Sequence, residues 1–152
     1  MRRFIIGISG ASGAVYGIRA LQTLKAVPDI ETHLVLSPSA KRTIIEETNW
    51  TVAAVEALAN VVHSHRDIGA AIASGSFQTI GMLVAPCSVK SLSGIVNSYG
   101  DNLLTRAADV CLKERRRLVL LVRETPLHLG HIELLGRACQ YGAVIQIGRA
   151  HV

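Results

Sequence analysis

Four short stretches of the chain combine glycines or small hydroxyl residues with a few charged groups, and each follows an apolar run. They are "SGASG" (9–13), "SPS" (37–39), "PCSVKS" (86–91) and "RETPLH" (123–128). Amides and hydroxyls at the start of a helix bind anions, because these amides have no partner within the helix and the dipole is positive there. Glu124 adds a carboxylate, a candidate general acid or base. These residue types favour a site that binds a phosphate-bearing ligand and moves a proton.

The glycines of the first stretch do not have the spacing of a dinucleotide fingerprint. Gly7, Gly10 and Gly13 give GxxGxxG, whereas the fingerprint is GxGxxG. An NAD-dependent oxidoreductase is therefore the least favoured function. The turn can accept an anion or the polar edge of a ring, or its glycines can be purely conformational, and spacing alone leaves both readings open.

The third stretch places Ser88, Lys90 and Ser91 close to the start of an expected helix. Together with the first turn they could hold the phosphate of a mononucleotide, although serine also simply caps helices. Arg106 and Lys113 lie seven residues apart on another expected helix and therefore project from the same face. They could hold a phosphate, or they could belong to a solvated helix face.

The fourth stretch brings Arg123 and Glu124 to the end of a fully apolar run. Glu124 is a candidate for proton transfer, and the alternative is an ion pair with Arg123 that holds the loop in place. For His128 and His131, which follow, we expect structural or capping roles rather than catalytic ones.

These stretches need a scaffold that brings them together, and the apolar pattern predicts one. Strands alternate with helices along the chain, which predicts an α/β fold with a doubly wound parallel sheet. Ligands of such sheets bind at the carboxyl ends of the strands, where the four stretches would lie. The expected strands are 4–8, 32–36, a short one within 60–65, 80–85, 118–122 and 143–147, and the expected helices are 14–26, 39–48, 52–60, 92–97, 103–115 and 129–141.

Length and composition restrict the class of protein. The 152 residues suffice for one domain with a core, and 49% of them are apolar although aromatic residues are few. The formal charge is +5, but the stretches around the Lys and Arg residues contain almost no aromatic residues, which argues against nucleic-acid binding. The three cysteines have neither the spacing of a zinc site nor that of a disulfide framework, so we expect no metal and a cytoplasmic, reducing location. No stretch has the length and hydropathy of a membrane span.

Five motifs in register resemble the UbiX-type flavin prenyltransferases. They are "GISGASGAVYG", "ETHLVLS", "SGSFQTIGMLVAPCSVKSLSGI", "LLTRAADVCLKERR" and "LVRETPLHLGH". The resemblance extends from Arg3 to about Ile145. It implies a Rossmann-like, flavodoxin-related flavoprotein fold, a three-layer sandwich that assembles into large homo-oligomers, usually dodecamers.

The resemblance also implies an activity. Members of this family join the dimethylallyl group of dimethylallyl phosphate to N5 and C6 of reduced FMN, and they need no metal. The prenylated FMN is used by a UbiD-type decarboxylase in ubiquinone biosynthesis or aromatic acid decarboxylation. The chain is therefore expected to be a prenyltransferase with reduced FMN as the prenyl acceptor.

Carried over motif by motif, the resemblance assigns roles to the residues singled out above and to a few others. Some of the phosphate ligands would come from a neighbouring subunit, and Ser12 would lie near N5 of the flavin. The expected catalytic residues are Ser12, Glu47 and Glu124; the expected ligands of the substrate phosphate are Arg106, Lys113 and Arg123; the expected FMN contacts are Gly10, Ala11, Ser12, Ser37, Ser88, Val89, Lys90, Ser91 and Arg123.

The end of the chain departs from the family pattern. After "GAVI" the family continues with a proline-rich stretch, a tyrosine and an arginine that bind the prenyl phosphate, and a helix, whereas this chain reads "QIGRAHV". We therefore predict a flavoprotein domain over residues 1–146 that lacks its C-terminal part, followed by a non-native tail over 147–152. A chain of this form is expected to bind FMN weakly and to turn over poorly.

Two alternative functions differ from this one in class. A flavin-dependent cysteine decarboxylase of the same superfamily would carry a motif of the "PASANT" kind where this chain has "PCSVKS". A non-catalytic FMN-binding module would have no need for the charged set Glu47, Arg106, Lys113 and Glu124. Flavin content, and then the mass of the flavin, would separate the three.

Overall fold

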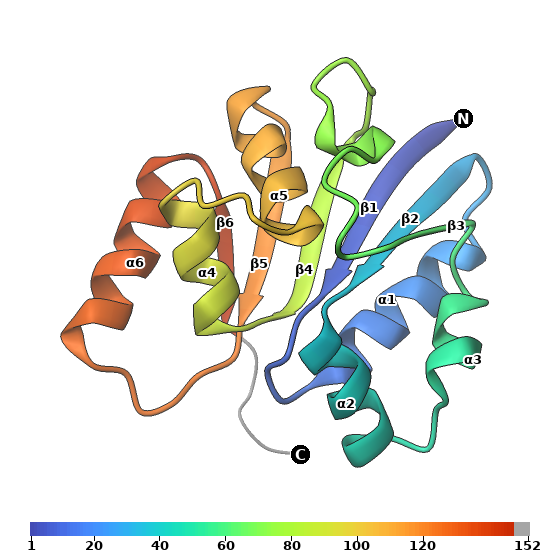
Figure 1. Ribbon diagram of the computed structural model, residues 1–152, viewed down its shortest axis with the longest axis horizontal. Coiled ribbons are helices and arrows are strands. Elements are labelled where there is room, and N and C mark those ends of the chain that lie inside the picture. The colour runs from blue at the N-terminus through green and yellow to red at the C-terminus, as the bar shows by residue number, and fades with distance from the viewer. Residues whose placement is uncertain (148–152) are drawn as a thin grey trace.

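The structure is a computed structural model in which residues 1–147 are described. Six strands form one sheet in the order β3-β2-β1-β4-β5-β6, and all neighbouring strands are parallel. Helices cover both faces of this sheet (Figure 1). The predicted α/β fold with a doubly wound parallel sheet is therefore confirmed. The predicted tail, 147–152, lies outside the described residues except for Ile147, and it stays a prediction.

The strands and helices follow the alternation that the apolar pattern predicts. The strands are β1 (Arg2–Ile8), β2 (Ile30–Leu36), β3 (Val61–His63), β4 (Gly81–Cys87), β5 (Arg117–Val122) and β6 (Val144–Ile147). The helices are α1 (Ala14–Lys25), α2 (Pro38–Glu47), α3 (Val52–Glu56), α4 (Val89–Val96), α5 (Leu103–Lys113) and α6 (Leu129–Gln140), with a 3₁₀ turn η1 (Ala71–Ala73).

The core has two parts, one on each face of the sheet. Successive residues of a strand point to opposite faces. In β1, Ile6 and Ile8 pack with residues of α1, α2 and α3, whereas Ile5 packs with residues of α4, α5 and α6. All three isoleucines are at most 1% exposed. Burial on both faces explains why the strands are continuous aliphatic runs rather than alternating ones.

The order of the strands reverses between β1 and β4. The chain moves from β1 outward to β2 and β3, and then returns to the other side of β1 to form β4. The loops after β1 and β4 consequently leave the sheet toward opposite faces and open a crevice between them. The second and fourth stretches, which follow β2 and β5, flank this crevice.

Some predicted element boundaries were wrong, each for a local reason. Helix α4 begins at Val89 rather than Leu92, because the Ser88 side chain caps it by accepting the N–H of Ser91. Helix α3 ends at Glu56 rather than at Asn60, whose Oδ1 instead accepts the N–H of Thr32, 2.8 Å away. Helix α5 ends at Lys113, before a left-handed residue at position 115, and the turn η1 was not predicted.

Candidate functional site

The four chemistry-bearing stretches meet at the carboxyl edge of the sheet, as predicted. The N–H of Ser37 donates to the carbonyl oxygen of Ile8, 3.1 Å away, which joins the second stretch to the end of β1. The N–H of Arg123 donates to the carbonyl oxygen of Cys87, 3.3 Å away, which joins the fourth stretch to the third. Neighbouring parallel strands therefore fix the stretches in space through backbone bonds.

Ser9 makes the remaining connection, between the first and third stretches. It is 1% exposed. Its hydroxyl donates to the carbonyl oxygen of Pro86 at 2.9 Å and accepts the N–H of Ser88 at 2.8 Å. One buried hydroxyl thus holds the loop after β1 against the start of α4.

A cavity of about 790 Å³ lies where the first three of these stretches meet. Three helices begin at it, and each has a polar N-cap, Ser37 for α2, Ser88 for α4 and Asn102 for α5. The positive ends of three helices therefore face one cavity, which favours an anionic ligand. The lining residues are Gly10, Ser37, Pro38, Ser39, His65, Ser88, Lys90, Ser91, Ser93, Gly94, Asn97, Tyr99, Asp101, Asn102 and Thr105.

The first loop is packed so closely against the second that a side chain at Gly10 would not fit. A Cβ atom added there would overlap the side chain of Ser39. Close approach therefore requires the glycine at position 10, whereas at Gly13 the backbone conformation requires it, because its φ is 108°. Gly10 also lines the cavity, so close packing at this position is compatible with a turn that binds a ligand.

A second cluster of predicted site residues surrounds Gly13, just before α1. Gly13 has a left-handed φ of 108°, and its N–H donates to Oε1 of Glu47 at 3.0 Å. The guanidinium of Arg123 lies over the ring of Tyr16, 5.0 Å from its centroid. Nη1 of Arg123 is buried and has no hydrogen-bond partner. A buried cationic nitrogen without a partner is suited to an anionic ligand that enters this cluster.

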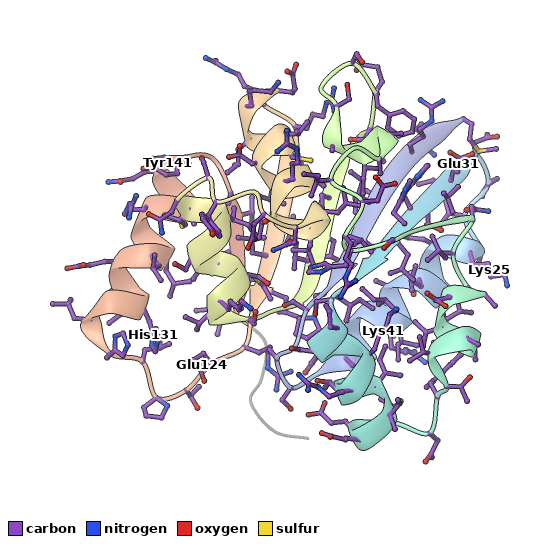
Figure 2. The ribbon with its side chains drawn as sticks, viewed as in Figure 1. Lys25, Glu31, Lys41, Glu124, His131 and Tyr141 are labelled. Carbon is purple, nitrogen blue, oxygen red and sulfur yellow. The ribbon has the colours of Figure 1, made fainter. Side chains whose placement is uncertain are left out.

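Glu124 lies next to this cluster in an exposed loop (Figure 2). Within residues 1–147 no ion pair joins it to Arg123, so the ion-pair alternative for this loop has no support. The loop ends in a reciprocal cap on α6. The N–H of His131 donates to Nδ1 of His128, and the N–H of His128 donates to Nδ1 of His131, both at 3.3 Å. The predicted capping role of these histidines is confirmed.

Not all predicted site residues reach the cavity within one chain. Arg106 is exposed beside Gly100, and Lys113 forms an ion pair with Glu114 at 3.2 Å. Helix α5 carries both away from the carboxyl edge, and Lys113 lies at its far end (Figure 1). Ala11 is buried, Ser12 is exposed and Val89 is half-buried, and none of these three lines the cavity. These assignments stay predictions.

Several cavity residues were missed by the reasoning from sequence. Asn102 had a usable signal, because an asparagine directly before an apolar helix is a good N-cap. Tyr99 and Asp101 lie in an irregular loop, and His65 follows the short strand β3. Nothing in the local pattern around these three residues indicates that they face a ligand.

Burial sets the ionisation of the groups nearest the site. It lowers the pKa of His65 below its usual 6.5, although Asp101 acts in the opposite direction. Burial also raises the pKa of the Cys87 thiol to about 12 and that of Cys111 to about 11. Both thiols are therefore protonated and unreactive at neutral pH.

In residues 1–147 no cluster of three or more His, Cys, Asp or Glu side chains could hold a metal ion, and no helix there has the length and hydropathy to cross a membrane.

The sheet is all-parallel, and capped helix starts surround a cavity at the point where its strand order reverses. These two features define a mononucleotide-binding α/β protein.

Comparison with known proteins gives the family. The sequence pattern of the Flavoprotein family matches residues 1–145. The "Flavin prenyltransferase UbiX" of Escherichia coli K12 is 64% identical over 145 residues, 95% of this chain and 77% of that protein. The protein of the same name from Thauera aromatica is 57% identical, over 94% of this chain and 73% of its own length. The chain therefore belongs to the Flavoprotein family and, within it, to the UbiX flavin prenyltransferases.

Solved structures agree with this placement. A crystal structure described as AnUbiX (PadA1) in complex with FMN and dimethylallyl pyrophosphate has a TM-score of 0.93 and 46% identity, over 95% of this chain and 76% of that one. A dodecameric FMN-dependent UbiX-like decarboxylase from Escherichia coli O157:H7 has a TM-score of 0.95 and 46% identity, over 97% and 80%. The cysteine decarboxylase TvaF has a TM-score of 0.78 at 17% identity, which shows a shared fold alone.

Proposed function

We propose that this chain is a flavin prenyltransferase that joins the dimethylallyl group of dimethylallyl phosphate to N5 and C6 of reduced FMN. The observation that carries the proposal is the 64% identity over 145 residues, a span that includes all four stretches at the carboxyl edge. The relative crystallised with FMN and dimethylallyl pyrophosphate supports the same pair of ligands.

The residues that line the cavity fit FMN. A volume of about 790 Å³ lies within the usual range for cofactor sites. The capped starts of α2 and α4, with the hydroxyls of Ser37, Ser88 and Ser91 and the ammonium of Lys90, offer donors to a phosphate and to a polyol chain. Asp101 is the one carboxylate among the lining residues, so the cavity as a whole favours an anion.

The cluster around Gly13 fits the donor substrate. When bound, reduced FMN supplies the nucleophilic ring atoms for the transfer. Departure of phosphate from the dimethylallyl carbon leaves negative charge that needs fixed cations in a water-poor site. The guanidinium of Arg123 is already oriented by Tyr16 and has a buried, unpartnered nitrogen available for that phosphate.

Carboxylates on either side of this cluster can hold or move the proton that the reaction releases. Glu47 is oriented by its bond from the N–H of Gly13. Glu124 is exposed in the loop after β5 and has no ion-pair partner within residues 1–147. We therefore assign proton transfer to Glu124 and a positioning role at the first loop to Glu47, with Ser12 close to the reacting nitrogen.

Arg106 and Lys113 fit the site of a neighbouring subunit better than that of their own chain. Both are exposed on α5 and do not line the cavity. The dodecameric relative supports a homo-oligomer, and we propose that in it these two residues complete the site of another copy. The choice between a monophosphate and a pyrophosphate donor and the supply of product to a UbiD-type decarboxylase belong to this proposal. So does a reducing, cytoplasmic location, which the three free cysteines support.

The proposal is tested by anaerobic incubation of the protein with reduced FMN and either dimethylallyl phosphate or its pyrophosphate. Mass spectrometry of the extracted flavin should reveal the mass increase of one dimethylallyl group. The matched control, Glu124→Gln, should bind FMN like the unmodified chain but transfer the group much more slowly. Flavin that binds but is recovered unchanged with both donors would overturn the proposal in favour of a non-catalytic FMN-binding module.

A further inference from the structure

His65 is a half-buried imidazole in the cavity that none of the roles above uses. It also lines a second cavity of about 230 Å³, together with Lys41 and Glu56. Its carbonyl oxygen accepts the N–H of Leu103, 2.9 Å away, which fixes the segment after β3 to the first turn of α5. Figure 1 shows this segment crossing in front of the sheet toward that helix. The position of the imidazole is therefore set by tertiary contact, and it faces space that a ligand can enter.

Groups that face His65 come from every element packed around it. Burial lowers its pKa; Asp101 and hydrogen bonding with Asn102 raise it, and Lys90 and Lys41 lower it further. The balance leaves an imidazole that is neutral at neutral pH, beside two lysines and a helix start, with the carboxylate of Asp101 acting in the opposite direction. The titratable and charged groups concerned are Lys41 of α2, Glu56 of α3, Lys90 of α4, Asp101 before α5 and His63 of β3.

The part of the cavity that the phosphate would occupy follows from the groups that could hold it. Ser12, the residue expected at the reacting nitrogen, belongs to the loop after β1, and Gly10 of that loop lines the cavity. Helix α5 begins over the face of the sheet, whereas α1, α2 and α4 begin at its carboxyl edge (Figure 1). Lys90 of α4, which the proposed function offers to the phosphate, lines the same cavity as His65, and its charge acts on the imidazole. An FMN phosphate held by Lys90 would therefore lie on the side of the cavity where His65 lies.

We propose that His65 is a ligand of the FMN phosphate and that it takes up a proton as the phosphate binds. The inference rests on the proposed function, because it requires FMN in this cavity. A phosphate dianion beside the imidazole offsets the burial and the two lysines that keep it neutral, so the charged form becomes the favoured one. Binding of FMN and binding of a proton are then coupled, whereas riboflavin, which has no phosphate, lacks this coupling.

The coupling has a size that binding measurements detect. If one proton is taken up for each FMN bound, the affinity for FMN relative to riboflavin rises by up to about tenfold for each pH unit lowered. The useful range is pH 8 to 7, because the phosphate itself has a second pKa near 6 and begins to lose its own charge below that range.

Titration calorimetry of FMN and riboflavin in buffers of different ionisation enthalpy measures the protons taken up at pH 7.5. The comparison uses the full chain, His65→Asn, which stays polar but does not titrate, and Arg66→Gln, which removes an exposed neighbouring cation that does not line the cavity. We expect proton uptake with FMN in the unmodified chain and in Arg66→Gln, and its loss, with weaker FMN binding and unchanged riboflavin binding, in His65→Asn.

Two results would overturn the proposal, and they are distinguishable. Equal proton uptake in His65→Asn and the unmodified chain would remove His65 from the phosphate site and leave FMN binding intact. Failure of the unmodified chain to bind FMN at any pH would overturn both this inference and the proposed function. Circular dichroism of His65→Asn distinguishes the effect of removing the imidazole from a loss of the fold.

Discussion

Removal of the Ser9 hydroxyl is the sharpest test of how the site is held together. Ser9 is 1% exposed and connects the loop after β1 with the start of α4 through Pro86 and Ser88. In Ser9→Ala both side-chain bonds are lost. The carbonyl oxygen of Pro86 keeps the N–H of residue 9, 3.2 Å away, as a donor, whereas the N–H of Ser88 loses the acceptor it has in this structure.

The cost follows from these contacts. Two hydrogen bonds contribute roughly 0.5–1.5 kcal/mol each, and a partly buried N–H left without an acceptor adds about 1 kcal/mol. We therefore expect the free energy of unfolding to fall by about 2–4 kcal/mol, or roughly 4–16 °C in Tm for a chain of this size. FMN affinity should fall as well, since the cap of α4 is no longer held against the first loop.

Urea denaturation followed by circular dichroism measures this loss. The matched control is Ser12→Ala, an exposed serine of the same loop, for which we expect a change within about 0.5 kcal/mol. If Ser9→Ala unfolds at the same urea concentration as the unmodified chain, the argument that one buried hydroxyl joins the two loops is wrong.

Three further predictions follow from the geometry. His128→Ala should lower the stability by about 1 kcal/mol, whereas His128→Asp should retain most of it, because aspartate is a good N-cap; equal denaturation curves for the two variants would contradict the capping role. Burial and then a neighbouring imidazole lower the pKa of His63 below 6.5, so the unfolded chain binds its proton first and stability falls as the pH drops below about 6.5. His63→Gln should make the dependence of the unfolding free energy on pH shallower between pH 7.5 and 5.5, and an unchanged slope would refute this. Thiol labelling of the native protein should modify exposed Cys139 quickly, and Cys87 and Cys111 only on unfolding; rapid reaction of all three would contradict the burial of the latter two.

Much of the fold was predictable because its central strands, β1, β2, β4 and β5, are largely buried. The runs "FIIGI" and "LVLLV" have few polar residues, and helices separate them, a pattern that few architectures other than a doubly wound sheet accommodate. Errors arose at boundaries where a single side-chain bond decides. The cap by Ser88 makes α4 begin three residues earlier than its apolar pattern suggests. The side chain of Asn60 bonds to Thr32, and α3 ends before it reaches Asn60.

Some residues of the candidate site could likewise be predicted from local sequence, and others could not. Serines that follow a strand and precede a helix are recognisable locally, and Ser37, Ser88 and Ser91 do line the cavity. His65 and Asp101 carry no such signal, because what places them is the contact between the segment after β3 and the start of α5. Arg106 and Lys113 show the converse case, since their seven-residue spacing puts them on one helix face without determining what that face meets.

By itself the sequence determined the order of strands and helices, the polar residues at the strand ends and, through five motifs in register, the family. These are properties of short segments, where apolar period, capping residues and motif spacing act locally. Only the tertiary structure decided that Ser9 joins two loops, that three capped helices face one cavity, and that His65 lies within it. Such relations depend on the strand order β2-β1-β4 and on how helices pack over it, which are set by the burial of the whole core rather than by any one segment.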